Sequence, residues 1–152
     1  MPKTKDLIIF YILSLTWGIV WSLVGLFVYL FSIIFLKDKI EVQKVAGRIA
    51  IRFKNGKFGG ASLGLVYLVG RFVGDRTHRH ELGHTLQNAI FGPLFILLIA
   101  IPSALRCSFW QKYRMKYYQK HSSYPEYDSI WFEKQATEFG NKYFSEVSIN
   151  GI

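Results

Sequence analysis

Near its N-terminus the chain has a long segment without a single charged side chain, and this segment limits the possible folds more than any other feature. Positions 7–36 hold 30 residues with no Asp, Glu, Lys or Arg, and Lys37 and Lys39 follow at once. About 20 apolar residues cross the hydrocarbon core of a bilayer, so this segment can cross with tilt. The apolar region of a cleaved signal peptide is shorter, about 7–15 residues. The segment therefore predicts an N-terminal transmembrane anchor over residues 1–36.

A second uncharged segment covers residues 82–105, but prolines interrupt it. Because proline breaks the helical hydrogen-bond pattern, Pro93 predicts a bend or break, with an apolar helix over 93–105 after it. Basic residues flank the segment on both sides, and basic flanks mark the cytoplasmic side of a membrane segment. We therefore expect this segment to enter the membrane and return on the same side, in the cytoplasmic membrane of a bacterium.

The composition agrees with a membrane protein. Hydrophobic residues make up 51% of the chain and charged residues only 19%, against about 25% charged in an average soluble domain. The net charge of +9 would suit nucleic acid, but the basic residues cluster beside apolar segments, where attraction to anionic lipid accounts for them. We therefore expect a lipid bilayer and no nucleic acid as partner. Cys107, the lone cysteine, excludes an internal disulfide.

Between the uncharged segments, residues 47–69 favour a small β structure. Residues 48–53 approach the alternation of a strand, and Asn55-Gly56 is a strong signal for a two-residue hairpin turn. The apolar stretch 61–69 is too short for a membrane helix, so we predict one buried or interfacial strand there. The predicted fold class is a mainly α integral membrane protein with a small β-hairpin or edge strand.

The most informative motif is His-Glu-Leu-Gly-His at positions 80–84. On a helix predicted over 77–92, His80 and His84 lie on one face one turn apart, so both imidazoles can bind a single Zn²⁺. Glu81 can then act on a water molecule at the metal. The alternative is an ordinary helix surface with two partly exposed histidines. A polar strip at the start of an apolar helix is costly unless it is paired or functional, which favours a site.

A catalytic zinc site needs a third protein ligand. Glu133 is the best placed, because Ala136 and Gly140 share its face on a tail helix predicted over 129–144 and would let that helix pack closely against the motif helix. The alternative for Glu133 alone is a solvated surface charge. The other downstream candidates are His121, Glu126, Asp128, Glu138 and Glu146.

Together, the motif at 80–84 and the later sequence Glu133-Lys134-Gln135-Ala136 resemble the gluzincin class of zinc metallopeptidases. In that class, the third ligand is a glutamate on a later helix. The similarity is greatest to the membrane-embedded branch with the CAAX prenyl proteases and the heat-shock membrane metalloproteases, whose glutamate opens an E-x-x-A-D pattern. The chain also resembles small bacterial membrane proteins with H-E-x-G-H-T, G-P-L and I-P-S sequences.

One residue departs from the pattern of that branch. Thr137 stands where the family has its aspartate. The resemblance therefore predicts that a ligand histidine lacks the carboxylate that would otherwise orient it.

The resemblance implies a minimal zincin-like core, membrane-embedded, over residues 37–152. Zn²⁺ held by His80, His84 and Glu133 would activate a water molecule, and Glu81 would act as general base and pass the proton to the leaving amine. The implied function is an integral membrane zinc metallopeptidase that hydrolyses peptide bonds near the membrane surface.

A peptide or a membrane protein is the expected substrate, and the strand over 61–69 would pair with it. A partner membrane protein could complete the small substrate chamber. Residues that could stabilise the oxyanion are His78, Tyr113 and Tyr143, and the sequence does not choose among them. The alternative function is a non-enzymatic small membrane protein that binds a partner or stabilises an assembly, with a structural or vestigial zinc site.

Overall fold

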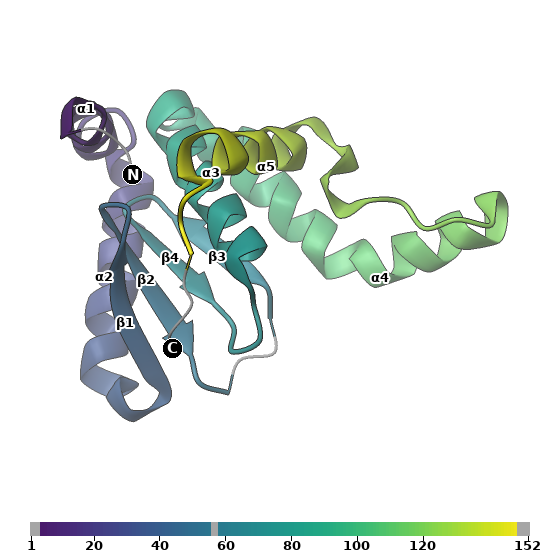
Figure 1. Ribbon diagram of the computed structural model, residues 1–152, viewed down its shortest axis with the longest axis horizontal. Helices are drawn as coiled ribbons and strands as arrows, with labels where there is room; N and C mark the ends of the chain where they lie inside the picture. Colours follow the sequence, from purple (N-terminus) through teal and green to yellow (C-terminus); the bar gives the residue numbers. More distant parts are fainter. Residues whose placement is uncertain (1–3, 56–57, 149–152) are drawn as a thin grey trace.

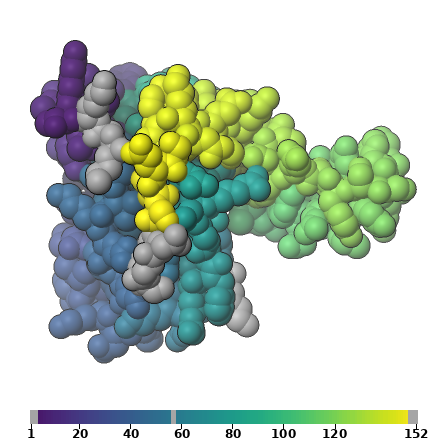
Figure 2. Space-filling view, in the orientation of Figure 1, coloured from purple at the N-terminus to yellow at the C-terminus, as the bar shows by residue number. Residues whose placement is uncertain are grey.

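The computed structural model describes residues 4–55 and 58–148. A four-stranded sheet has α2 against one face and α3 and α5 on the other side, and α4 extends away from this body as an arm (Figures 1 and 2). The helices are α1 (Thr4–Leu15), α2 (Ile19–Phe35), α3 (Asp75–Phe91), α4 (Ile101–His121) and α5 (Trp131–Phe144). The strands are β1 (Ile40–Val45), β2 (Arg48–Phe53), β3 (Gly60–Leu63) and β4 (Val66–Val69). Short helical turns cover Lys37–Lys39 and Tyr127–Ser129, and a π-helix covers Ile96–Ala100.

The sheet is mixed, with strand order β1-β2-β4-β3. β1 and β2 form an antiparallel hairpin whose turn, Ala46-Gly47, has positive φ at both residues, as a tight two-residue turn requires. β2 runs parallel to β4, and β3 pairs antiparallel to β4. β3 is thus an edge strand, and it lies beside α3.

Alternation along the strands creates two apolar layers. Ile51 and Val66 lie on the face of the sheet covered by α2, where Tyr29 packs against them. Tyr67 and Leu82 belong to the layer on the opposite face. The remaining buried members of that second layer are Val45, Ala50, Val69 and Phe144. These two layers fix α3, the helix of the histidine motif, against the sheet.

The first uncharged segment is not one helix. α1 ends at Leu15, α2 begins at Ile19, and the two are bent by 94°. The break packs against the end of α3: Trp17 Nε1 donates to the Ile90 carbonyl at 3.2 Å, and a Cβ on Gly18 would lie 2.7 Å from the Asn88 amide nitrogen. The break between α1 and α2 therefore coincides with contacts to α3. The uniformly uncharged composition of residues 7–36 does not indicate it.

The predicted fold class is wrong. Among the described residues, no single helix is long and apolar enough to cross a membrane, while the bent pair α1 and α2 passes that test by length and composition. In place of a mainly α integral membrane protein with a small β-hairpin or edge strand and a minimal zincin-like core, the chain forms a four-stranded mixed sheet with helices on both sides.

The second uncharged segment breaks where Pro93 predicted. α3 ends at Phe91, and Gly92 has a φ of +55°. A Cβ on Gly92 would lie 2.3 Å from Trp17 Nε1, so the break also needs a residue without a side chain. After the π-helix, α4 continues to His121, well beyond the predicted end of the apolar helix at residue 105.

The strand predicted over 48–53 is β2, but the strand predicted over 61–69 is two strands. Gly64 adopts a φ of +66° and begins the turn between β3 and β4. The predicted Asn55-Gly56 turn includes Gly56, which lies outside the described residues. The chain also contains β1, which the sequence analysis did not predict.

Candidate metal centre

Two helices that pack unusually closely bring the predicted ligands together. A Cβ on Gly83 of α3 would lie 1.9 Å from the carbonyl oxygen of Ala136 on α5. Likewise, a Cβ on Gly140 of α5 would lie 2.3 Å from the carbonyl oxygen of Arg79. The backbones of α3 and α5 thus touch, in agreement with the small residues predicted along this face of the tail helix.

Three side-chain atoms converge between these helices. The Oε2 atom of Glu133 lies 3.0 Å from His80 Nε2 and 3.3 Å from His84 Nε2, and the two Nε2 atoms are 3.1 Å apart. Ligand atoms bound tetrahedrally at the usual zinc distances are separated by about 3.3 Å. The three residues could therefore hold a metal ion. The other downstream candidates, which do not belong to this group, are His121, Glu126, Asp128, Glu138 and Glu146.

The remaining ring nitrogens of both histidines also have partners. His80 Nδ1 lies 2.9 Å from Thr137 Oγ1, and His84 Nδ1 lies 2.7 Å from Gln87 Oε1. Gln87 is held in turn, because its Nε2 donates to the Phe132 carbonyl at 2.8 Å. When each Nδ1 donates its proton to its oxygen partner, each Nε2 keeps a free lone pair. Both lone pairs can then bind a metal ion between the two histidines and Glu133. Thr137 thus fills the place where the resemblance predicted a missing partner.

The electrostatics of the group suit a cation. Burial favours a raised pKa for Glu133, but hydrogen bonds from His80, His84 and Ser103 outweigh it and lower this pKa well below its ordinary value. Burial likewise disfavours a charged His84, yet its hydrogen bond to Glu133 and the charge of Glu81 raise its pKa overall. Without metal, a proton on His84 neutralises the buried carboxylate. A metal ion would take the place of that proton.

Glu81 lies beside the group on the turn of α3 that faces β3. Its side chain is 5% exposed, and its Oε2 accepts a hydrogen bond from Ser62 Oγ at 2.7 Å. A Cβ on Gly60 would lie 2.3 Å from Oε1, so β3 needs a glycine to make room for the carboxylate. The edge strand therefore positions the group predicted to act as general base.

Tyr127 is a residue of this region that the sequence analysis missed. Burial and the charge of Glu133 raise the pKa of Tyr127, and its hydroxyl hydrogen-bonds to Ser103. Its ring centroid lies 6.5 Å from that of His80. Tyr127 lies in a turn more than forty residues after the histidine motif, with no local pattern around it, so only the fold reveals the contact.

The three residues that the sequence suggested for stabilising the oxyanion are not well placed for that role. His78 is buried and already engaged, with its Nδ1 3.1 Å from the Tyr67 hydroxyl and its Nε2 3.2 Å from Arg52. Tyr113 and Tyr143 are exposed, and their rings pack against other aromatic side chains: Tyr113 against Trp110 and Tyr117, and Tyr143 against Phe139.

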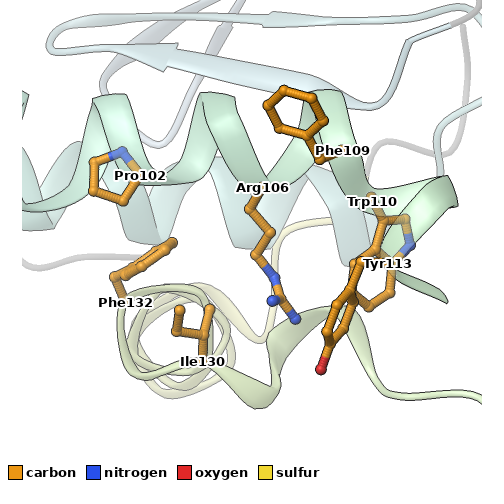
Figure 3. A pocket seen from close by; sticks show the side chains of 7 residues that line it. All are labelled: Pro102, Arg106, Phe109, Trp110, Tyr113, Ile130 and Phe132. Carbon is orange, nitrogen blue, oxygen red and sulfur yellow. The ribbon is translucent and has the colours of Figure 1, made fainter. Parts of the chain in front are cut away.

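A pocket of about 260 Å³ lies between α4 and the start of α5 (Figure 3). Arg106 extends along it and donates to the Tyr127 carbonyl at 2.6 Å and to Ser129 Oγ at 3.1 Å, which fixes the turn that carries Tyr127. The residues that line the pocket are Pro102, Arg106, Phe109, Trp110, Tyr113, Ile130 and Phe132. Neither the three ligands nor Glu81 is among them, so the pocket is separate from the metal group.

Comparisons of the chain with protein-family models, with curated proteins and with solved structures gave no match. The resemblance to gluzincins therefore stays a prediction based on the motif.

Proposed function

We propose that the chain is a zinc-dependent metallopeptidase in which His80, His84 and Glu133 would hold the ion. The observation that carries the proposal is the convergence of two imidazole nitrogens and one carboxylate oxygen within 3.3 Å of one another. Two histidines and one glutamate form a donor set that zinc uses in catalytic sites. The anchored Nδ1 atoms support this choice, because ligand histidines in metalloenzymes are oriented in this way.

Glu81 is the proposed general base. A bound zinc ion would polarise the scissile carbonyl and lower the pKa of the attacking water. Glu81 would take the proton of that water and deliver it to the leaving amine. The hydrogen bond from Ser62 Oγ to Oε2 holds the Glu81 carboxylate in one orientation.

β3 is the element beside Glu81 that an extended substrate could reach. The Ser62 carbonyl of this strand already has a partner, because Trp21 Nε1 donates to its oxygen at 2.9 Å. Backbone pairing with a peptide along the whole strand, as proposed from the sequence, would require this indole to move. The Gly60 end of β3 adjoins the Glu81 carboxylate directly.

The low exposure of the three metal ligands supports a second candidate function. The side chains of His80, His84 and Glu133 are only 16%, 7% and 0% exposed. A structural metal site is closed, whereas a catalytic one keeps an open position. The alternative is therefore a non-enzymatic protein that a metal ion at this site stabilises.

Two variants separate the candidates. His84→Ala should lose the bound zinc, measured by metal analysis of the purified protein, while His121→Ala on the exposed arm should keep about one ion per chain. Full zinc occupancy in His84→Ala would contradict the ligand assignment. Glu81→Gln should keep the zinc and lose hydrolysis of a fluorogenic peptide library by at least about 100-fold.

The matched control for Glu81 is Glu138→Gln, on the exposed side of α5. It should retain both zinc and hydrolysis. Equal peptide hydrolysis by the wild type and Glu81→Gln would overturn the assigned role of Glu81. Zinc binding without hydrolysis in the wild type would favour the structural alternative.

A further inference from the structure

The exposed side of α2 is entirely apolar. Phe27, Ile34 and Phe35 are 70%, 66% and 67% exposed. Every other exposed residue of this helix is also a large hydrophobic one: Ile19, Val20, Leu23, Val24, Leu26, Leu30 and Phe31. Soluble proteins rarely expose a contiguous apolar patch of more than a few hundred Å², and such patches mark interaction sites.

The polar and small residues of this region face inward instead. Ser22, Gly25 and Ser32 are the buried residues of α2, and Ser14 is buried on α1. A Cβ on Gly25 would lie 2.0 Å from the carbonyl oxygen of Leu63, so the helix contacts β3 through its small residues. A surface helix of a soluble protein has the opposite arrangement, with its apolar stripe toward the core. Small residues inside and large apolar residues outside are typical of helices surrounded by lipid.

Residues 90–105 extend this face. The rings of Trp21 and Phe95 have centroids 6.3 Å apart, so α2 and the segment after α3 lie in contact. The exposed residues of this segment are also all apolar: Ile90, Pro93, Leu94, Leu97, Leu98, Ile101, Ala104 and Leu105. We call the exposed side chains of residues 7–35 and 90–105 the apolar surface.

The apolar surface offers almost no hydrogen bonds to a partner. Among the described residues, its exposed polar groups are the Thr16 hydroxyl and the Trp17 indole nitrogen, which already donate to the carbonyls of Ile12 at 2.6 Å and Ile90 at 3.2 Å. Protein interfaces carry about one hydrogen bond per 100–200 Å² and a polar rim. Hydrocarbon needs neither, and it requires the polar groups that face it to be satisfied internally, as these two are.

Charge complementarity points to the same partner. Lys37 and Lys39, on either side of Asp38, follow the first uncharged segment directly. Further basic residues along α4 are Lys112, Arg114, Lys116 and Lys120. Basic side chains next to an apolar face bind anionic lipid headgroups.

We propose that the apolar surface inserts into the hydrocarbon region of a lipid bilayer from one side, without a helix that crosses it, and that the neighbouring basic residues contact anionic headgroups. This surface is distinct from the metal group. It needs neither zinc nor hydrolysis, so the proposal can fail or hold independently of the proposed function.

Spin labels provide the test. In a Cys107→Ser background, Phe27→Cys places a nitroxide on the apolar surface. Phe72→Cys places one outside it, at a phenylalanine that is 79% exposed against 70% for Phe27. The full chain is reconstituted into vesicles of equimolar phosphatidylcholine and phosphatidylglycerol. Oxygen, which concentrates in hydrocarbon, should relax the label at position 27 several-fold more than a water-soluble nickel chelate does. The label at position 72 should show the reverse.

Two results of the spin-label experiment would overturn the insertion part of the proposal. Equal accessibility of both positions to the nickel chelate would mean that the apolar surface is in water. Protection of position 27 from both reagents, with spin–spin broadening, would mean that a second copy covers it. Flotation with pure phosphatidylcholine vesicles tests the headgroup part, because binding should be weaker than with the anionic mixture, and equal binding would contradict it. All measurements are made with and without zinc.

Discussion

The Ser103 hydroxyl donates a hydrogen bond of 2.5 Å to Oε1 of Glu133, so α4 orients the carboxylate that α5 contributes to the metal group. Glu133 therefore has one oxygen fixed by Ser103 and the other directed at the two histidines. The ligand is positioned before any metal binds. Helix α4, otherwise an exposed arm without a buried residue, thereby takes part in the site.

Ser103→Ala should weaken zinc binding by about 10-fold to 100-fold, since loss of an outer partner of a metal ligand typically costs that much. Competition with a chromogenic chelator measures the affinity. Ser108→Ala is the control, because this exposed hydroxyl on the same helix bonds only to the Ala104 carbonyl. Equal affinities of the wild type and Ser103→Ala would contradict the role given to the serine.

Thr137→Val should also weaken zinc binding, because valine has the shape of threonine but cannot accept the proton of His80 Nδ1. Thr137→Asp keeps an acceptor and adds the charge that the resemblance predicts there, so it should bind zinc at least as tightly as the wild type. The chelator competition used for Ser103 gives both values. Equal zinc affinities of Thr137→Val and the wild type would show that zinc binding does not depend on the hydrogen bond between His80 Nδ1 and Thr137.

The metal-free protein should show a bell-shaped pH dependence in the free energy of unfolding contributed by the His84–Glu133 pair. The pKa of Glu133 is lowered on folding, so its contribution is present above pH 4.5 and is lost as the pH falls through the folded value. The pKa of His84 is raised, so its contribution is present below pH 6.5 and is lost as the pH rises through the folded value.

Urea unfolding of the wild type and His84→Ala, in the presence of a chelator, isolates this contribution as the difference between the two proteins. The difference should be largest between pH 4.5 and 6.5. Saturating zinc should abolish the loss of the free energy of unfolding that the wild type shows as the pH rises, because the metal replaces the proton on His84. A difference that is constant from acid to alkaline pH would show that the pair is not ionised.

Gly83→Ala should destabilise the protein strongly. The added methyl group would lie 1.9 Å from the Ala136 carbonyl oxygen, so α3 and α5 must move apart. Overpacking of this kind typically costs about 1–3 kcal/mol, and the movement should also reduce zinc affinity. Gly59→Ala is the control, since nothing lies within 4 Å of its added Cβ. Chemical unfolding of both variants checks the prediction, and a loss below about 0.5 kcal/mol for Gly83→Ala would contradict it.

The features that the sequence predicted well depend on local spacing. His80 and His84 share a face because they are four residues apart on a helix, and Ala136 and Gly140 allow close packing for the same reason. The break near Pro93 follows from the chemistry of one residue. Each of these inferences needs only a short window of sequence.

The features that the sequence missed depend on contacts between distant segments. The bend between α1 and α2 is packed against Asn88 and Ile90, about seventy residues away. Gly64 divides an apolar stretch that composition alone presents as one strand. Ser103 and Tyr127 join the site only because α4 and the turn after it return to α5.

The contact between Trp17 and the end of α3 has a mechanical consequence. The indole donates to the Ile90 carbonyl and fills the space that a side chain on Gly92 would need. Ile90 lies on the same unbroken helix as His84, less than two turns further along. The contact that fixes the α1–α2 break and the histidines of the metal group therefore belong to one rigid element.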